Sequence, residues 1–74
     1  MRLETIIEVD PEKMGGIPVF RGTRVPIQNL FDYLKGGDSV ELFLDHFPTV
    51  EREQAIALLE TIQETVLGEY EAAA

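Results

Sequence analysis

The stretch from Gly15 to Leu30 carries the densest chemistry in the chain, because two arginines flank a Gly-Thr pair just before a predicted helix start. Guanidinium groups and turn N–H groups displayed together can bind an anion such as phosphate, or the arginines can pair with local carboxylates. The stretch lacks both the phosphate loop of nucleotide hydrolases and the dinucleotide fingerprint, so it is a weak phosphate motif. Both interpretations of Arg21 and Arg24 stay open.

Residues suited to catalysis or metal binding are scarce. The sole histidine, His46, precedes Phe47-Pro48 at a predicted helix end, where a structural or helix-dipole role suits it better than a catalytic one. Glu60 and Glu64 fall at i and i+4, but no histidine or third acid accompanies them, which favours a solvated face over a metal site. We therefore expect neither an enzyme nor a bound cofactor.

Charge is divided along the chain, although the net value is −8. Residues 13–35 carry four basic side chains against Asp32 alone, whereas residues 37–74 carry nine carboxylates against Arg52 alone. A general nucleic-acid coat is not expected, since nonspecific binding scales with the number of phosphates that Lys and Arg neutralise. The candidate nucleic-acid contacts are Lys13, Arg21, Arg24, Arg52 and Gln54.

The 74 residues suffice for one small domain. A domain of this size buries only about 60% of its unfolded surface, so stability can lean on self-association. The chain has no cysteine for a disulfide framework, and no apolar run approaches the ~20 residues of a membrane helix. We expect a soluble cytoplasmic protein with a single domain over residues 1–68 and a flexible tail over 69–74.

The N-terminal third favours short strands. Residues 4–9 are rich in β-forming side chains, and Asp10-Pro11 stops the run, which predicts a strand. After a Met-Gly-Gly turn signal at 14–16, residues 17–20 favour extended backbone. Because proline lacks an N–H donor, the proline in this second segment suits an edge strand.

Helical spacing begins after the two arginines. Pro26 suits a first helical position, where its missing N–H costs nothing. From Ile27 onward, apolar side chains fall at i, i+3, i+4 and i+7, which predicts a helix to about Lys35. The glycine pair 36–37 then ends the helix, because glycine tolerates left-handed backbone.

Two further helices follow in the same pattern. Asp38 is the expected cap of a helix that ends at Phe47, because Pro48 prevents its continuation. Thr49 is the expected cap of a longer helix that runs to Gly68. This pair has the proportions of a helix-turn-helix. The expected fold class is therefore mainly α: a three-helix, helix-turn-helix domain with short N-terminal β-strands.

The last helix is a poor DNA reader by sequence. In a helix-turn-helix its first residues, Glu51, Arg52, Glu53 and Gln54, would lie near phosphates and base edges. The two glutamates would repel the DNA backbone, although Arg52 and Gln54 can still read bases. Simple packing of this helix is the plainer interpretation.

The same helix carries more apolar length than a monomer of this size readily buries. The candidate dimer or partner surface consists of Leu59, Ile62, Val66 and Tyr70. Self-pairing through this helix is one explanation, and pairing through the exposed edge of the N-terminal strand is another. We expect a homodimer.

The run from Asp10 to Glu60 closely resembles the small bacterial family known as domain of unknown function 433. The matching features are turn glycines and prolines, an Arg-Gly-Thr-Arg sequence and an aromatic-proline pair. They comprise Asp10-Pro11, Gly15-Gly16, Pro18-Val19, Arg21-Gly22-Thr23-Arg24, Pro26, Gly36, Phe47-Pro48, Ala55 and Leu58.

This resemblance implies a winged-helix or homeodomain-like three-helix fold with short N-terminal strands, often paired into dimers. It also implies an antitoxin role, since such proteins are commonly encoded beside PIN-like ribonuclease toxins, which they are thought to neutralise. No catalytic residues carry over. The most distinctive positions, which we take as the expected partner-binding residues, are Arg21, Gly22, Thr23 and Arg24.

Together these features favour an antitoxin-like protein that binds a PIN-like toxin. Such a nuclease holds its metal with carboxylates and presents a basic surface to RNA. Arg21 or Arg24 can reach the metal-binding carboxylates of the nuclease, while the acidic helices cover its basic RNA-binding surface. One alternative is a transcriptional autorepressor whose dimer contacts operator DNA through Lys13, Arg21, Arg24 and Arg52. Another is a small adaptor that binds neither nuclease nor DNA.

Overall fold

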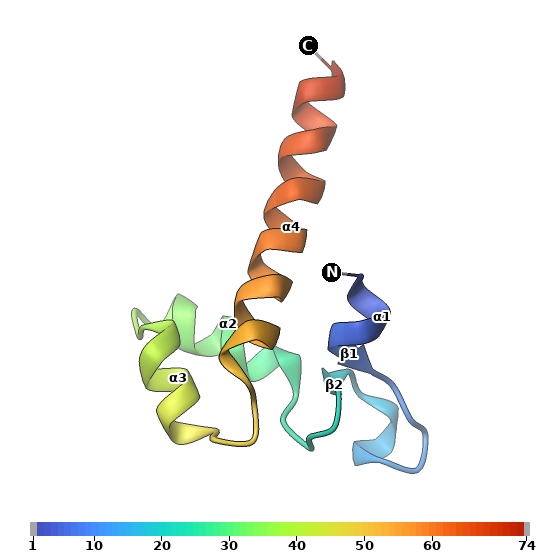
Figure 1. Ribbon diagram of the computed structural model, residues 1–74, viewed down its shortest axis with the longest axis vertical. Coiled ribbons are helices and arrows are strands. Elements are labelled where there is room, and N and C mark those ends of the chain that lie inside the picture. The colour runs from blue at the N-terminus through green and yellow to red at the C-terminus, as the bar shows by residue number, and fades with distance from the viewer. Residues whose placement is uncertain (1, 74) are drawn as a thin grey trace.

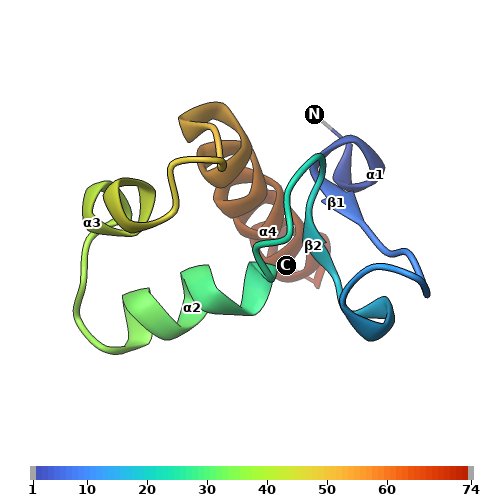
Figure 2. The same ribbon diagram turned by 90° about the horizontal axis from the view of Figure 1, so that it is seen from below.

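The computed structural model describes residues 2–73. Helices α2 and α3 lie on one side of α4, while α1 and the strands lie on the other, and the C-terminal half of α4 projects beyond the rest of the molecule (Figures 1 and 2). In chain order the elements are α1 (Leu3–Ile6), β1 (Ile7–Glu8), the 3-10 turn η1 (Met14–Gly16), β2 (Val19–Phe20), α2 (Ile27–Lys35), α3 (Val40–His46) and α4 (Arg52–Ala73). The predicted class, mainly α with short N-terminal strands, is confirmed.

The predicted strand over residues 4–9 is wrong in its first half. One helical turn, α1, takes its place, and only β1 pairs with β2, antiparallel, in the register Ile7 to Phe20 and Glu8 to Val19. The turn persists because α1 packs against α4 and because the Arg21 side chain donates to backbone carbonyls at its end. Tertiary contacts therefore override the β propensity of this segment.

Helix α2 begins one residue later than predicted. Pro26 occupies the N-cap with extended backbone (φ −61°, ψ 138°), and it also forms an isolated antiparallel bridge with Val19. That bridge requires the extended ψ, so the proline cannot be the first helical residue. The C-terminal prediction is confirmed, because Lys35 is the last residue of α2 and Gly37 takes the left-handed φ of 89°.

The cap of α3 is Ser39, not Asp38. The Ser39 hydroxyl accepts a hydrogen bond from the Leu42 N–H at 3.1 Å, which satisfies a donor of the first turn. At the other end, α3 stops at His46, ahead of Pro48 as the sequence predicts.

Helix α4 begins at Arg52, so Thr49 is not its cap. The segment before it turns through a Val50 N–H to Phe47 carbonyl bond and buries Val50 in the core. An earlier helix start would break this turn. Instead, the Gln54 side chain accepts from the Glu51 N–H at 3.0 Å, which is one half of a capping box.

The predicted end of this helix at Gly68 is also wrong. Helix α4 continues to Ala73, so the predicted tail 69–74 is helical through residue 73, and residue 74 lies outside the described part. One interior glycine costs a helix only about 1 kcal/mol relative to alanine, and such a cost need not stop it. Within residues 2–73, no helix combines the length and apolar character needed to cross a membrane.

The core is organised around Phe43. Its side chain is fully buried, and its ring centroid lies 5.9 Å from that of Phe20, 5.5 Å from that of Tyr33 and 5.0 Å from that of Phe47. These rings come from β2, α2, α3 and the α3–α4 connection, so one side chain joins four parts of the chain. The buried apolar residues are Ile6, Val19, Phe20, Leu30, Phe43, Val50, Ala55 and Leu58.

We expect Phe43→Ala to lower the free energy of unfolding by about 3–5 kcal/mol, because it removes a buried ring and leaves a cavity. Leu42→Ala is the matched control on the same helix; at 37% exposure, Leu42 should contribute less than about 1 kcal/mol. Urea unfolding followed by circular dichroism measures both. Equal losses for the two variants would contradict this description of the core.

Candidate functional site

The sequence 21–24 forms a tight turn that its own residues hold in place. Gly22 supplies the left-handed φ of 80° that the turn requires. The Thr23 hydroxyl donates to the Phe20 carbonyl at 2.7 Å and accepts from the Val25 N–H at 3.0 Å. Thr23 is only 6% exposed, so its side chain serves the turn rather than an outside ligand.

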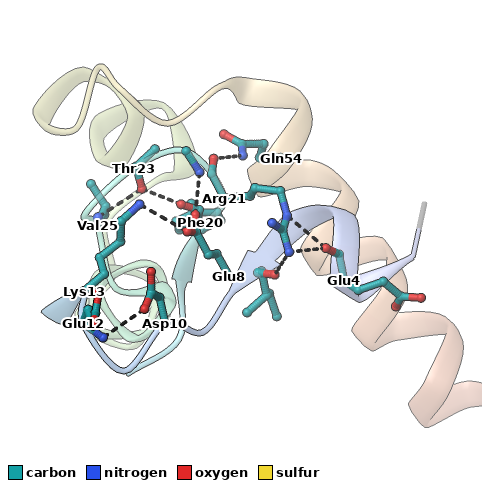
Figure 3. Close-up of polar contacts among 12 residues, drawn as sticks. Glu4, Glu8, Asp10, Glu12, Lys13, Phe20, Arg21, Thr23, Val25 and Gln54 are labelled. Carbon is teal, nitrogen blue, oxygen red and sulfur yellow. Dashed lines mark hydrogen bonds and ion pairs between the residues drawn. The ribbon is translucent and has the colours of Figure 1, made fainter. Parts of the chain in front are cut away.

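Arg21 is bound to its own chain. Its Nε and Nη2 atoms donate to the Glu4 carbonyl at 3.0 and 2.6 Å, and Nη2 also donates to the Ile7 carbonyl at 3.0 Å (Figure 3). The last carbonyls of a helix lack partners within it, and a cation there is also favoured by the helix dipole. Arg21 therefore caps α1 from a distant part of the sequence.

The backbone of Arg21 is held at the same time. Its N–H donates to the Ile6 carbonyl at 2.8 Å, and its carbonyl accepts from Nε2 of Gln54 at 3.0 Å. Gln54 lies in the first turn of α4, and its other side-chain atom, Oε1, accepts from the Glu51 N–H. Arg21 thus connects α1, the turn and α4.

Glu8 fixes the remaining side of the turn. Its Oε1 accepts from the Gly22 N–H at 3.1 Å, and its Oε2 lies 3.3 Å from Nζ of Lys13 (Figure 3). The Gly22 hydrogen bond, followed by the Lys13 ammonium group, lowers the pKa of the Glu8 carboxyl from its ordinary value. Glu8 is therefore held as a carboxylate between the turn and the 10–13 loop.

Arg24 differs from the other three residues of the turn. Its side chain is exposed, and among the contacts of residues 2–73 it makes no hydrogen bond or ion pair. The turn therefore presents one guanidinium group that is not used by the fold. Of the four predicted partner-binding residues, Arg21, Gly22 and Thr23 serve the fold and Arg24 remains available.

Most of the predicted nucleic-acid contacts have partners within the chain. Lys13 is engaged by Glu8, and Gln54 bridges Glu51 to the turn. Arg52 pairs with Glu41 of α3. Arg21 bonds to backbone carbonyls, so four of the five candidates have partners within the chain, and Arg24 is the exception.

The predicted partner surface on α4 is only partly free. Leu59 packs against the core, whereas Ile62, Val66 and Tyr70 are 38%, 46% and 74% exposed. The exposure rises toward the C-terminus because α4 leaves the body of the molecule there (Figure 1). The structure thus leaves an apolar face without cover within the described chain.

An open cavity of about 630 Å³ lies between the turn and the start of α4. Its edge includes the exposed carboxylates Glu51 and Glu53, beside the backbone of the arginine turn. The lining residues are Thr5, Arg21, Gly22, Thr49, Glu51, Glu53 and Gln54. A second, more apolar groove of about 530 Å³ lies along the first turns of α2.

Sequence reasoning missed Glu8 and the role of Gln54. Gln54 carries a usable signal, because Gln three residues after a cap position is typical of a capping box, and it indicates Glu51 rather than the predicted Thr49 as the cap. No sequence signal marks Glu8, because its partners Lys13 and Gly22 are 5 and 14 residues away along the chain. His46 lies beside Tyr33, with its Nδ1 2.7 Å from the Tyr33 hydroxyl.

The fold and the turn define a class of protein: a small, mainly helical domain with a short strand pair and an Arg-Gly-Thr-Arg turn clamped to its first helix. The chain belongs to the DUF433 family, described as a protein of unknown function, whose model matches residues 7–60. The resemblance seen in the sequence is thereby confirmed.

Two proteins illustrate the similarity. The uncharacterized protein y4eO of Sinorhizobium fredii (strain NBRC 101917 / NGR234) is 39% identical over 49 residues, which are 66% of this chain and 22% of that protein. This chain therefore matches about a fifth of the length of that relative. The crystal structure of a DUF433 member from Anabaena variabilis aligns with a TM-score of 0.67 and 26% identity, over 97% of this chain and 72% of the other.

Alanine substitutions of the two arginines of the turn should change the free energy of unfolding by different amounts. We expect Arg21→Ala to lower the free energy of unfolding by about 1–2 kcal/mol, because two backbone carbonyls lose a charged donor at a partly exposed site. Arg24→Ala should stay within about 0.5 kcal/mol of the parent, since the fold does not use that side chain. Urea unfolding of both variants is the measurement, and equal effects would contradict the clamp.

The lowered pKa of Glu8 predicts how the free energy of unfolding changes with pH. Because its pKa is lowered in the folded chain, its contribution to stability is present above the unfolded pKa and is lost as pH falls through the folded pKa. Glu8→Gln should therefore lose less stability than the parent between about pH 7 and pH 3. Thermal unfolding of the parent and of Glu8→Gln at both pH values tests this, and equal losses of stability in the two proteins would contradict it.

Proposed function

We propose that the chain is a non-catalytic protein-binding module that acts in the cytoplasm as an antitoxin, neutralising a PIN-like ribonuclease. The observation that carries the proposal is the structure of the turn. Hydrogen bonds from three different parts of the chain hold its backbone, yet Arg24 has no partner in the described chain. A fixed turn with one unused guanidinium is suited to recognition.

Rigidity of the turn supports binding because it lowers the entropy cost of ordering the loop. Hydrogen bonds from Thr23, Glu8 and Gln54 hold the backbone around Arg24, so less loop freedom is lost when a partner binds. A guanidinium group binds carboxylates in a bidentate geometry, and arginine is enriched among residues that dominate binding energy. The carboxylate cluster of a PIN-like nuclease is an acceptor of this kind.

The charge of the helices supports the same partner. Residues 37–74 carry nine carboxylates against Arg52, and that arginine already pairs with Glu41. Glu51 and Glu53 are exposed beside the cavity at the start of α4, close to the turn. An acidic surface of this kind complements the basic RNA-binding rim of a nuclease, and such complementarity raises the association rate and the selectivity.

Operator binding has less support. Four of the five candidate contacts are engaged within the chain, and the start of α4 presents Glu51 and Glu53 where a DNA-recognition helix needs neutral or basic groups. We therefore place the protein partner first and DNA second.

The test uses the protein encoded in the neighbouring reading frame, which the proposal requires to be a PIN-like ribonuclease. We expect the full chain to bind it and inhibit its RNA cleavage, and Arg24→Ala to raise the Kd about tenfold or more by calorimetry. Lys35→Ala is the matched control, since it removes an exposed cation on α2 and should leave the Kd within about twofold.

Three results would overturn the proposal. The first is a neighbouring gene of another kind, and the second is unchanged affinity after Arg24→Ala. The third is absence of nuclease binding together with operator binding whose log affinity falls by about 0.9 per neutralised phosphate against log salt, the signature of a DNA-binding protein.

A further inference from the structure

The end of α4 is a helix without cover. Every residue from 62 to 71 is exposed, and this segment, here called the α4 arm, projects beyond the body of the molecule (Figure 1). The arm extends for about 15 Å at 1.5 Å per residue. An isolated helix shorter than about 12–15 residues is marginal in water, so contact with another surface would stabilise the arm.

Apolar side chains gather on one side of the arm. At about 100° per residue, Ile62, Val66 and Tyr70 lie within about 80° of the helix circumference, and they are 38%, 46% and 74% exposed. Leu67, which is 48% exposed, extends this apolar arc to about 140°. One uncharged polar residue, Gln63, lies within the arc. An apolar arc wider than about 100° is typical of a helix face that packs against another surface.

Carboxylates border the apolar arc. Glu60, Glu64 and Glu71 fall within about 40° of one another, beside one edge of the arc. Glu69 lies beside the other edge. All four side chains are exposed, and none of residues 53–71 is basic. The arm therefore presents an apolar face with an acidic border.

The acidic border indicates which kind of surface can cover the arc. It would repel the phosphates of nucleic acid and the anionic headgroups of a membrane surface. A second α4 helix packed on the arc would bring its own glutamates toward the same border. The surface that fits is an apolar protein groove with Lys or Arg side chains along its edges, because amphipathic helices bind such grooves through apolar side chains at i and i+4.

We infer that the α4 arm docks in an apolar groove with a basic border on the nuclease partner, as a second contact separate from Arg24. The inference rests on the proposed function for the identity of that partner, since a nuclease that binds RNA needs basic side chains for the phosphates. The partner then holds the chain through one guanidinium group and one helix face.

The two contacts lie far apart on the chain. The β2–α2 connection, which carries Arg24, and the arm lie toward opposite ends of the long axis of the molecule (Figure 1). Once one contact forms, the other becomes intramolecular, so two modest contacts together give tight binding. Because the two contacts share no residue, the fold-losses of affinity caused by changing each of them should multiply.

The apolar contact is tested with the full chain and the nuclease from the neighbouring reading frame. Glutamine is the replacement, because it is uncharged and has a higher helix propensity than isoleucine or valine. We expect Ile62→Gln/Val66→Gln, here called the arc pair, to raise the Kd about tenfold or more by calorimetry. Thr65→Gln is the matched control: it is exposed beside Val66 but outside the arc, and should leave the Kd within about twofold.

The acidic border is tested by moving the site of charge removal. Glu60→Gln/Glu64→Gln removes two carboxylates beside the arc, and Glu12→Gln/Asp45→Asn removes two exposed carboxylates elsewhere, so both variants have the same net charge. At low salt we expect the first variant to raise the Kd about threefold or more and the second to stay within about twofold. Salt of about 0.5 M should remove this difference, because it screens exposed charges.

The outcomes separate this inference from the proposed function. If Arg24→Ala weakens nuclease binding and the arc pair does not, the inference is wrong and the proposed function stands. If the parent does not bind the nuclease, both are wrong. A combined variant that binds no more weakly than Arg24→Ala alone would also overturn the second contact.

Self-pairing through the arc is a further outcome, measured by sedimentation equilibrium without the nuclease. If the parent is a dimer that the arc pair dissociates, a second copy covers the arc and the inference is wrong. If circular dichroism shows that the arc pair has lost helix, Tyr70→Gln, at the most exposed position of the arc, replaces it in every measurement.

Discussion

The bonding of the Arg21 guanidinium to the carbonyls of Glu4 and Ile7 is the interaction on which the N-terminal half depends. The four-residue helix α1 cannot hold itself together, because most of its backbone groups lack helical partners. Arg21 supplies one of those partners, while Gln54 holds the Arg21 carbonyl from α4. One residue thereby sets how the strands and the first helix meet the helical body.

These contacts show that the Arg-Gly-Thr-Arg sequence mainly stabilises the fold. Gly22 provides the backbone conformation, Thr23 closes the turn from inside, and Arg21 is directed at the chain itself. A chemically conspicuous motif is thus largely a folding motif, and the part available to a ligand is reduced to Arg24. Membership of the DUF433 family is consistent with this, since a shared fold does not by itself identify a shared ligand.

The sequence predicted what local rules control. Apolar spacing found α2, α3 and α4, and Gly37 and Pro48 marked helix ends correctly. The errors fell at α1, which Arg21 caps from a distant part of the chain, and at helix boundaries, where Val50 enters the core before α4 and Ser39 rather than Asp38 caps α3. The different roles of the two arginines could not be predicted either. No local pattern indicates that the Arg21 side chain bonds to a residue 17 positions away in the sequence while the Arg24 side chain does not.

The continuation of α4 past Gly68 has a consequence for local stability. The amides of its first turns lie against the core, whereas those around Val66 and Tyr70 are protected only by the helix itself, which a glycine weakens further. Hydrogen exchange should therefore be graded along this one helix, slow near Leu58 and fast beyond Ile62. Any surface that covers the end of α4 would slow that exchange without changing the fold, which makes the helix an internal reporter of whether it is bound.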